Sequence, residues 1–174
     1  VGPQNLHPFR FPGAQVILAQ NGDLYEFGKM KHALADRLPA EIIRHVEGST
    51  DTEWVYASVL SQLENPWGKA SADQLAEAVS GAIRLIREVR DELGLHTQSP
   101  VNIVVSDGDS LVATRFCFDY GWYPDDESFF AGERQFDYTT LWCALGRSFD
   151  NSSGEWAMQY NDELRFGAAI VASE

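Results

Sequence analysis

The spacing of apolar residues changes twice along the chain and divides it into three stretches. Residues 14–19 form a short apolar run bounded by Gly13 and Asn21-Gly22, which is typical of a buried strand. Between residues 29 and 93, apolar positions recur every three or four residues, which indicates helices. From residue 101 onward, short apolar runs alternate with turns. This order predicts an α+β fold with a mostly antiparallel sheet.

The clearest helix is predicted over residues 71–93. Its apolar side chains lie on one face at helical spacing, and Gly94 follows it as a terminator. Shorter helices are expected at 29–38, ended by Pro39, and at 41–46. Members of the apolar stripe of the long helix are Leu75, Val79, Ile83, Ile86, Val89 and Leu93.

A further helix is predicted to begin at the polar sequence Thr50-Asp51-Thr52-Glu53. Thr50 and Glu53 have the spacing of a capping box, in which each side chain bonds the other residue's backbone N–H. Asn65-Pro66 stops the segment. Glu53 is therefore expected to serve as the capping partner of Thr50.

The last third of the chain is predicted to be strands joined by turns. Nearer the N-terminus, Asn21-Gly22 is also a common hairpin dipeptide, and Leu24–Phe27 could continue the first strand beyond it. An acidic, aromatic loop at 119–137 either covers a pocket or contacts a partner, or is simply solvated. The expected strands are 101–105, 111–118, 139–145, 156–160 and 168–172, with turns at 106–109 and 150–154.

Composition excludes several classes of function. Apolar residues make up 44% of the 174 residues, which is enough for a packed core, and the net charge is −13. A surface of that charge repels nucleic acid and anionic membranes. No apolar run is long enough to span a bilayer, and no signal peptide opens the chain. A cytoplasmic location is therefore expected.

Two cysteines and four histidines offer no recognisable metal or disulfide pattern. Cys117 and Cys143 are far apart, lie in apolar strand-like stretches, and are expected to be buried core thiols. The histidines are scattered without ligand spacing, and phosphate-binding and serine-nucleophile motifs are absent. Neither a metal nor an organic cofactor is predicted.

Three short polar stretches remain as candidate chemistry. They are Asn5-Leu6-His7-Pro8-Phe9, then Asn21-Gly22 after the first strand, then Thr50-Asp51-Thr52-Glu53. Each alone has an ordinary structural explanation: an extended segment, a hairpin turn and a helix start. Their order and intervals carry more information than any one of them.

In this order, NLHPF, NG and TDTE resemble the glutaminase domain of the class II, N-terminal-nucleophile (Ntn) glutamine amidotransferases. The later stretches VVSDGDSLVATRF (104–116) and IVASE (170–174) are similar to a stand-alone subgroup that hydrolyses γ-glutamyl compounds. The resemblance covers most of the chain and is strongest over residues 5–53. It implies a four-layer αββα Ntn-hydrolase sandwich with two antiparallel sheets.

The resemblance also implies roles for individual residues. Asn21, through its side-chain amide, and Gly22, through its backbone N–H, would form the oxyanion hole. Asp51 would bind the α-ammonium group of the substrate, with Thr50 shaping the pocket around it. His7 borders the site and would support it or contact the substrate.

The chain departs from the family pattern at its ends. The family nucleophile is a cysteine at the mature N-terminus, whereas this sequence begins with Val1 and has no cysteine nearby. Residues 1–174 are thus expected to be a single domain lacking an N-terminal segment, with its nucleophile, and the extreme C-terminus. The family's carboxylate-binding arginine would lie in the same upstream segment, and Gln20 stands where many members carry histidine.

Two functional readings stay open at this stage. One is an enzyme that cleaves the γ-amide of glutamine or a γ-glutamyl compound through a cysteine thioester. The alternative is a catalytically inactive pseudo-amidotransferase that binds or regulates; rescue by Cys117 or Cys143 lacks a supporting base. The expected partner is a small molecule, without nucleic acid or membrane, and a partner subunit or homo-oligomer is possible.

Overall fold

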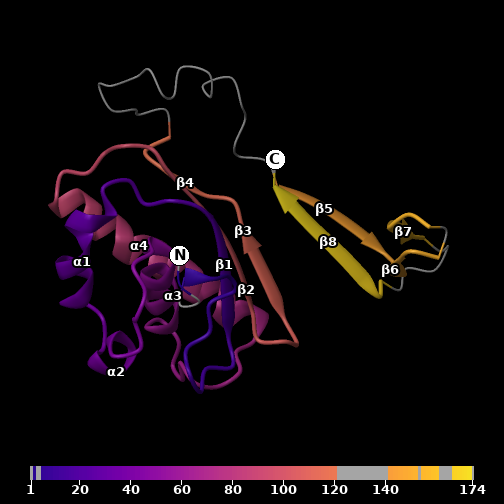
Figure 1. The fold of residues 1–174 in the computed structure, drawn as a ribbon, viewed down its shortest axis with the longest axis horizontal. Helices are drawn as coiled ribbons and strands as arrows, with labels where there is room; N and C mark the ends of the chain where they lie inside the picture. The colour runs from indigo at the N-terminus through magenta and orange to yellow at the C-terminus, as the bar shows by residue number, and fades with distance from the viewer. Residues whose placement is uncertain (1, 3–4, 121–140, 153, 161–165, 174) are drawn as a thin grey trace. The chain divides into compact units, whose positions relative to one another are not determined.

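The computed structural model of the chain describes residues 2, 5–120, 141–152, 154–160 and 166–173 (Figure 1). The chain divides into two compact units, residues 1–134 and residues 135–174. The first unit contains all the helices that the structure describes, together with one antiparallel sheet. The second contains short antiparallel strand pairs.

The first unit runs from a strand through four helices to three further strands. Its longest helix is α4 and its longest strand is β2. In chain order, the elements are β1 (Ile17–Gly22), α1 (Phe27–Ala35), α2 (Ala40–Ile43), α3 (Asp51–Leu60), α4 (Ala72–Glu92), β2 (Ser99–Ser106), β3 (Leu111–Thr114) and β4 (Cys117–Phe118).

The central strand of this sheet is β2. It pairs antiparallel with β1 on one side and with β3 and β4 on the other. In the β1–β2 register, Asn21 lies opposite Asn102 and Gly22 opposite Val101. The end of β1 therefore meets the beginning of β2, although helices α1 to α4 separate the two strands in sequence.

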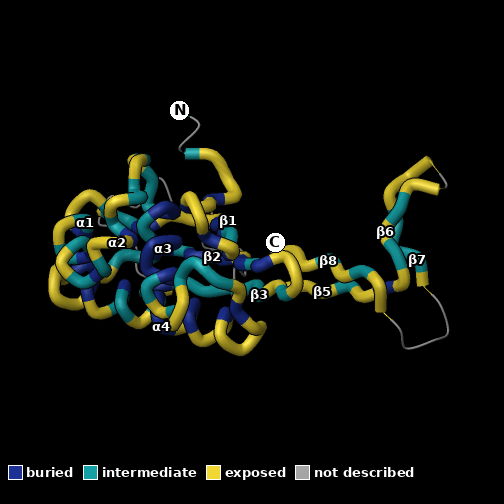
Figure 2. Tube along the Cα trace, turned by 90° about the horizontal axis from the view of Figure 1, so that it is seen from below, coloured by how far each residue is buried: buried dark blue, intermediate teal, exposed yellow. Residues whose placement is uncertain are grey.

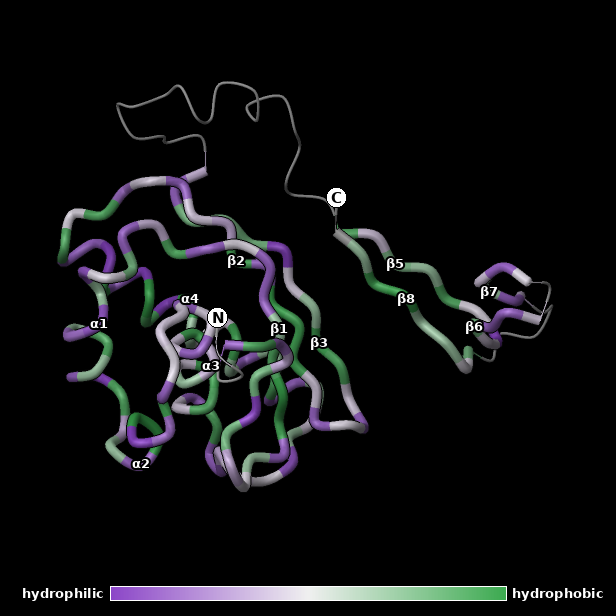
Figure 3. The backbone as a smooth tube through the Cα atoms, viewed as in Figure 1, coloured by the Kyte–Doolittle hydropathy of each residue, from purple (hydrophilic) through white to green (hydrophobic). Residues whose placement is uncertain are grey.

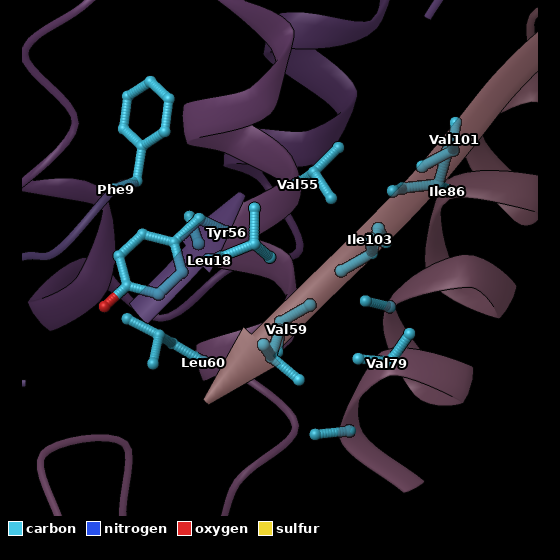
Figure 4. Close-up of a cluster of buried hydrophobic side chains, with 14 of the residues drawn as sticks. Phe9, Leu18, Val55, Tyr56, Val59, Leu60, Val79, Ile86, Val101 and Ile103 are labelled. Carbon is cyan, nitrogen blue, oxygen red and sulfur yellow. The ribbon is translucent and has the colours of Figure 1, made fainter. Parts of the chain in front are cut away.

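The core of the first unit lies between the sheet and helices α3 and α4. Side chains alternate along β2, so that Val101, Ile103 and Val105 are fully buried while Val104 is 40% exposed. Figure 4 shows Val101 and Ile103 pointing toward Val79 and Ile86 of α4. Burying each such side chain contributes about 1.5–3 kcal/mol, which holds the helices on one face of the sheet.

Helix α4 agrees with its sequence pattern. Ser71 is its N-cap and Leu93 its C-cap, and Leu75, Val79 and Val89 are buried on the predicted face. Gly94 follows with φ 65°, a left-handed conformation that glycine adopts readily. Figure 2 shows how burial changes from one side of this helix to the other.

Two predictions about strands need correction. Leu24–Phe27 is not a strand, because a turn at residues 25–26 leads directly into α1. The return strand predicted at 111–118 is interrupted at residues 115–116. Its two parts keep one register against β2, since Ile103 faces Thr114 and Pro100 faces Cys117.

The second unit contains two strand pairs with many exposed apolar side chains. Trp142, Leu145 and Val171 are all exposed to solvent within this unit, and Figure 3 shows β5 and β8 coloured as hydrophobic. The pairs are β5 (Leu141–Gly146) with β8 (Ala168–Ser173), and β6 (Ser148–Asp150) with β7 (Ala157–Gln159).

The predicted α+β class with antiparallel sheets is confirmed. The helical layer and the sheet beneath it supply two of the layers expected of an αββα sandwich. Strand β6 was not predicted. Most of the acidic loop predicted at 119–137 lies outside the described residues. Cys143 is exposed on β5 and Cys117 only partly buried, so the prediction of two buried core thiols is wrong.

Candidate active site

Asn21 and Gly22 end strand β1 at an exposed position. They do not form a hairpin, because β1 stays paired with β2 through Gly22 and the chain then turns into α1. Gly22 has φ 127°, and a Cβ atom there would lie 1.9 Å from the backbone oxygen of Pro100. Only glycine fits this close approach between strands, whatever else the residue does.

Asp51 binds the chain immediately beyond Gly22. Its Oδ2 accepts the backbone N–H of Leu24 at 2.7 Å, and its Oδ1 accepts the N–H of Thr52 at 2.8 Å. The first bond joins the start of α3 to the segment after β1, which lies 27 residues earlier. A carboxylate has about four acceptor positions, so Asp51 retains capacity for a cationic ligand.

Gln20 and His7 join the same cluster. The backbone N–H of Gln20 donates to His7 Nδ1 at 3.3 Å, which places the imidazole beside the end of β1. The Gln20 side-chain Nε2 lies 3.5 Å from both Asp51 Oδ2 and the carbonyl oxygen of Gly22. His7 also packs edge-on against Phe9, at 5.1 Å between ring centroids.

The N-terminal segment is tied to the loop before α3 by a reciprocal pair of hydrogen bonds. The N–H of Ser49 donates to Asn5 Oδ1 at 3.1 Å, and Asn5 Nδ2 donates to Ser49 Oγ at 3.3 Å. Together with the contacts of Gln20 and Asp51, these bonds bring the three polar stretches into one cluster.

The predicted capping box at the start of α3 does not form. Thr50 is the N-cap residue, but its side chain makes no capping bond, and its buried Oγ1 has no partner among the described residues. Glu53 is 3% exposed and accepts instead from the N–H groups of Glu47 and Gly48, at 2.9 and 2.6 Å. Glu53 therefore fixes the loop that precedes Asp51.

Two residues that the sequence does not single out, Ser99 and Arg90, stabilise the segment that follows β1. Ser99 Oγ accepts the N–H of Tyr25 at 2.9 Å and a bond from Arg90 Nη1 at 3.0 Å. Arg90 is fully buried and also contacts Asp119. Its position on α4 looks like an ordinary polar face in the sequence, so no local signal reveals this network.

Electrostatics near the cluster favour a cation. Burial, and then the negative charge of Asp51, raise the pKa of Asp23 above its usual value. Two carboxylates at close quarters repel each other, and a bound ammonium would relieve that repulsion.

A pocket of about 300 Å³ lies beside the N-terminal segment and is lined by residues that flank His7. It includes Leu6, Pro8, Glu47 and Glu53, but not Asn21 or Asp51. In the part of the chain that the structure describes, no three His, Cys, Asp or Glu side chains are grouped to hold a metal. The helices described here are also too short or too polar to cross a membrane.

Comparison with known proteins identifies the family of the chain. The sequence profile of the family described as glutamine amidotransferases class-II matches residues 1–118, which is more than half of the chain. The chain therefore belongs to the class-II glutamine amidotransferase family. No curated protein matches it.

Among solved structures, the chain is similar to a glutamine aminotransferase class-II domain protein from Silicibacter pomeroyi. The two are 21% identical with a TM-score of 0.49, and the match covers 66% of this chain. It spans about half, 49%, of that protein.

Proposed function

We propose that this chain carries most of a glutaminase site that hydrolyses the γ-amide of glutamine or of a γ-glutamyl compound. The observation that carries the proposal is the 2.7 Å bond from the N–H of Leu24 to Asp51. This bond holds the Asp51 carboxylate at Leu24, which follows the candidate oxyanion donors Asn21 and Gly22 by two residues. A small amino acid could contact both the carboxylate and these donors.

In the proposed reaction, a cysteine thiolate attacks the γ-carbonyl carbon and forms a C–S bond. The negative charge that develops on the carbonyl oxygen is received by the Asn21 amide and the Gly22 N–H. The intermediate collapses to a thioester as the C–N bond breaks, and ammonia leaves with the proton that the thiol gave up on becoming a thiolate. Water then hydrolyses the thioester to give the acid and regenerate the thiol.

The thiol in this proposal belongs to a cysteine upstream of residue 1. Cys117 is a poor substitute, because its Sγ donates to the Phe118 carbonyl oxygen at 3.4 Å and burial raises the pKa of its thiol. Cys143 is an exposed free thiol on β5 of the second unit, and the proposal does not assign it the role of nucleophile.

The test uses the chain expressed together with its upstream segment, with release of ammonia and glutamate as the readout. Glutamine and γ-glutamyl peptides are the substrates. Cys117→Ser should keep full activity, whereas replacing the upstream cysteine by alanine should abolish it. Glutamine binding without turnover by the wild type would instead favour the inactive binding domain.

Asn21→Ala tests the oxyanion hole directly. Loss of one such donor should reduce kcat about 10²- to 10³-fold. Asn151→Ala, at an exposed turn of the second unit, is the matched control and should leave kcat unchanged. Full turnover by Asn21→Ala would remove the assignment.

A further inference from the structure

Gln20 is a buried polar residue to which neither the sequence nor the proposed reaction gives a role. Its side chain is 8% exposed and follows the fully buried Leu18 on the inward face of β1. Burying a carboxamide costs free energy unless its polar atoms are bonded. Its contacts should therefore explain its place.

The amide nitrogen of Gln20 has two neighbours, and both are acceptors. Nε2 lies 3.5 Å from Asp51 Oδ2 and 3.5 Å from the Gly22 carbonyl oxygen. Because both neighbours accept, the nitrogen rather than the oxygen of the amide must face them. These distances are at the long end for hydrogen bonds, so each bond is weak by itself.

Two side-chain oxygen atoms, one on Gln20 and one on the residue before Asp51, have no hydrogen-bond partner within the described part of the chain. They are Gln20 Oε1 and Thr50 Oγ1, and both are buried. Buried polar atoms without partners are unfavourable, so the bonds that the amide nitrogen of Gln20 does make are the ones that favour its buried position.

We propose that Gln20 is a positioning residue of the glutaminase site, whose carboxamide joins the ammonium-binding carboxylate of Asp51 to the oxyanion-hole residue Gly22. The inference rests on the proposed function. Gly22 is the last residue of β1, so a bond to its carbonyl oxygen limits rotation of the peptide group that leaves the strand. Binding of an ammonium at Asp51 then also orders the donors for the oxyanion.

The first test is Gln20→Leu in the chain with its upstream segment. Loss of the amide should lower kcat/KM for glutamine about tenfold, with KM raised and kcat reduced, because the bond reaches both ends of the site. Rates are normalised to folded protein measured by near-ultraviolet circular dichroism. A purely structural role would reduce the folded fraction but not the kcat/KM of that fraction.

The second test is the pH profile of Gln20→Glu, which places a carboxyl group beside Asp51 and near Asp23, with His7 bonded to the same backbone. Repulsion from Asp51 should raise the pKa of the introduced carboxyl group. Below that pKa the neutral acid can donate to Asp51 as the amide does, and above it the two charges repel. Relative to wild type, kcat/KM should therefore recover as the pH falls.

Gln15→Glu is the matched control, because Gln15 is exposed two residues before β1 and gains the same charge. Its kcat/KM relative to wild type should not change with pH. The inference is overturned if the kcat/KM of Gln20→Leu equals that of wild type. It is also overturned if the kcat/KM of Gln20→Glu relative to wild type does not change with pH. Absence of turnover in the wild type would refute the proposed function, and this inference with it.

Discussion

The starts of helices α3 and α4 share a sequence signature but differ in structure. Both read as a hydroxyl residue followed three positions later by an acid or amide, Thr50 with Glu53 and Ser71 with Gln74. At α4 the capping box forms, with the N–H of Ser71 donating to Gln74 at 2.9 Å. At α3 it does not form.

The difference follows from what surrounds each helix start. Ser71 and Gln74 are exposed, so their best partners are each other's backbone groups. Glu53 is buried against the loop before it and bonds Glu47 and Gly48, while Asp51 bonds Leu24. At the start of α4, Ser71 and Gln74 thus bond each other, whereas the start of α3 holds other parts of the chain in position.

The largest expected effect is on the free energy of unfolding, when the residue three positions after the N-cap of each helix is replaced. Glu53→Ala should lower the free energy of unfolding by about 3 kcal/mol, because two backbone N–H groups lose a charged, buried acceptor. Gln74→Ala, its counterpart in α4, should cost less than about 1 kcal/mol. Urea unfolding measures both, and equal losses would contradict the comparison.

The acids of the two first turns should differ in their effect on activity, measured per folded molecule because Asp51 also accepts two backbone N–H groups. Asp51→Asn keeps the shape of the side chain but removes its charge, and should lower kcat/KM for glutamine about 30-fold, chiefly through KM. Asp73→Asn in α4 is the matched control and should leave kcat/KM unchanged. An unaltered kcat/KM in Asp51→Asn would remove the ammonium-binding assignment.

Ser71→Ala tests the N-cap of α4, where the capping box does form. Loss of its bond from the N–H of Gln74 should lower the free energy of unfolding by about 1 kcal/mol. Thermal or urea unfolding gives that value, and kcat/KM per folded molecule should stay at the wild-type level. A change in kcat/KM would mean that α4 also takes part in the site.

Thr50→Ala is expected to have the smallest effect. Its hydroxyl caps no backbone group, so the free energy of unfolding should change by less than about 0.5 kcal/mol, in contrast to Ser71→Ala. If the hydroxyl contacts the substrate, kcat/KM should fall about three- to tenfold. A loss of stability equal to that of Ser71→Ala would mean that the Thr50 hydroxyl does cap α3.

Much of the fold could be predicted because its signals are local. The stripe from Leu75 to Val89 has helical spacing, and α4 buries it where expected. The three polar stretches NLHPF, NG and TDTE could also be recognised as candidate site sequences. Asn21-Gly22 has the chemistry of a turn in any sequence, and only pairing with β2 showed that the strand continues through it.

By itself, the sequence determined the elements and the residue types of the site, because periodicity and side-chain chemistry are properties of short segments. The tertiary structure decided which partner each polar group received. The contacts of Asp51 with Leu24 and Gln20 and of Tyr25 with Ser99 join residues 27 to 74 positions apart. Such partners are selected by the packing of α3 and α4 on the sheet, which no local pattern encodes.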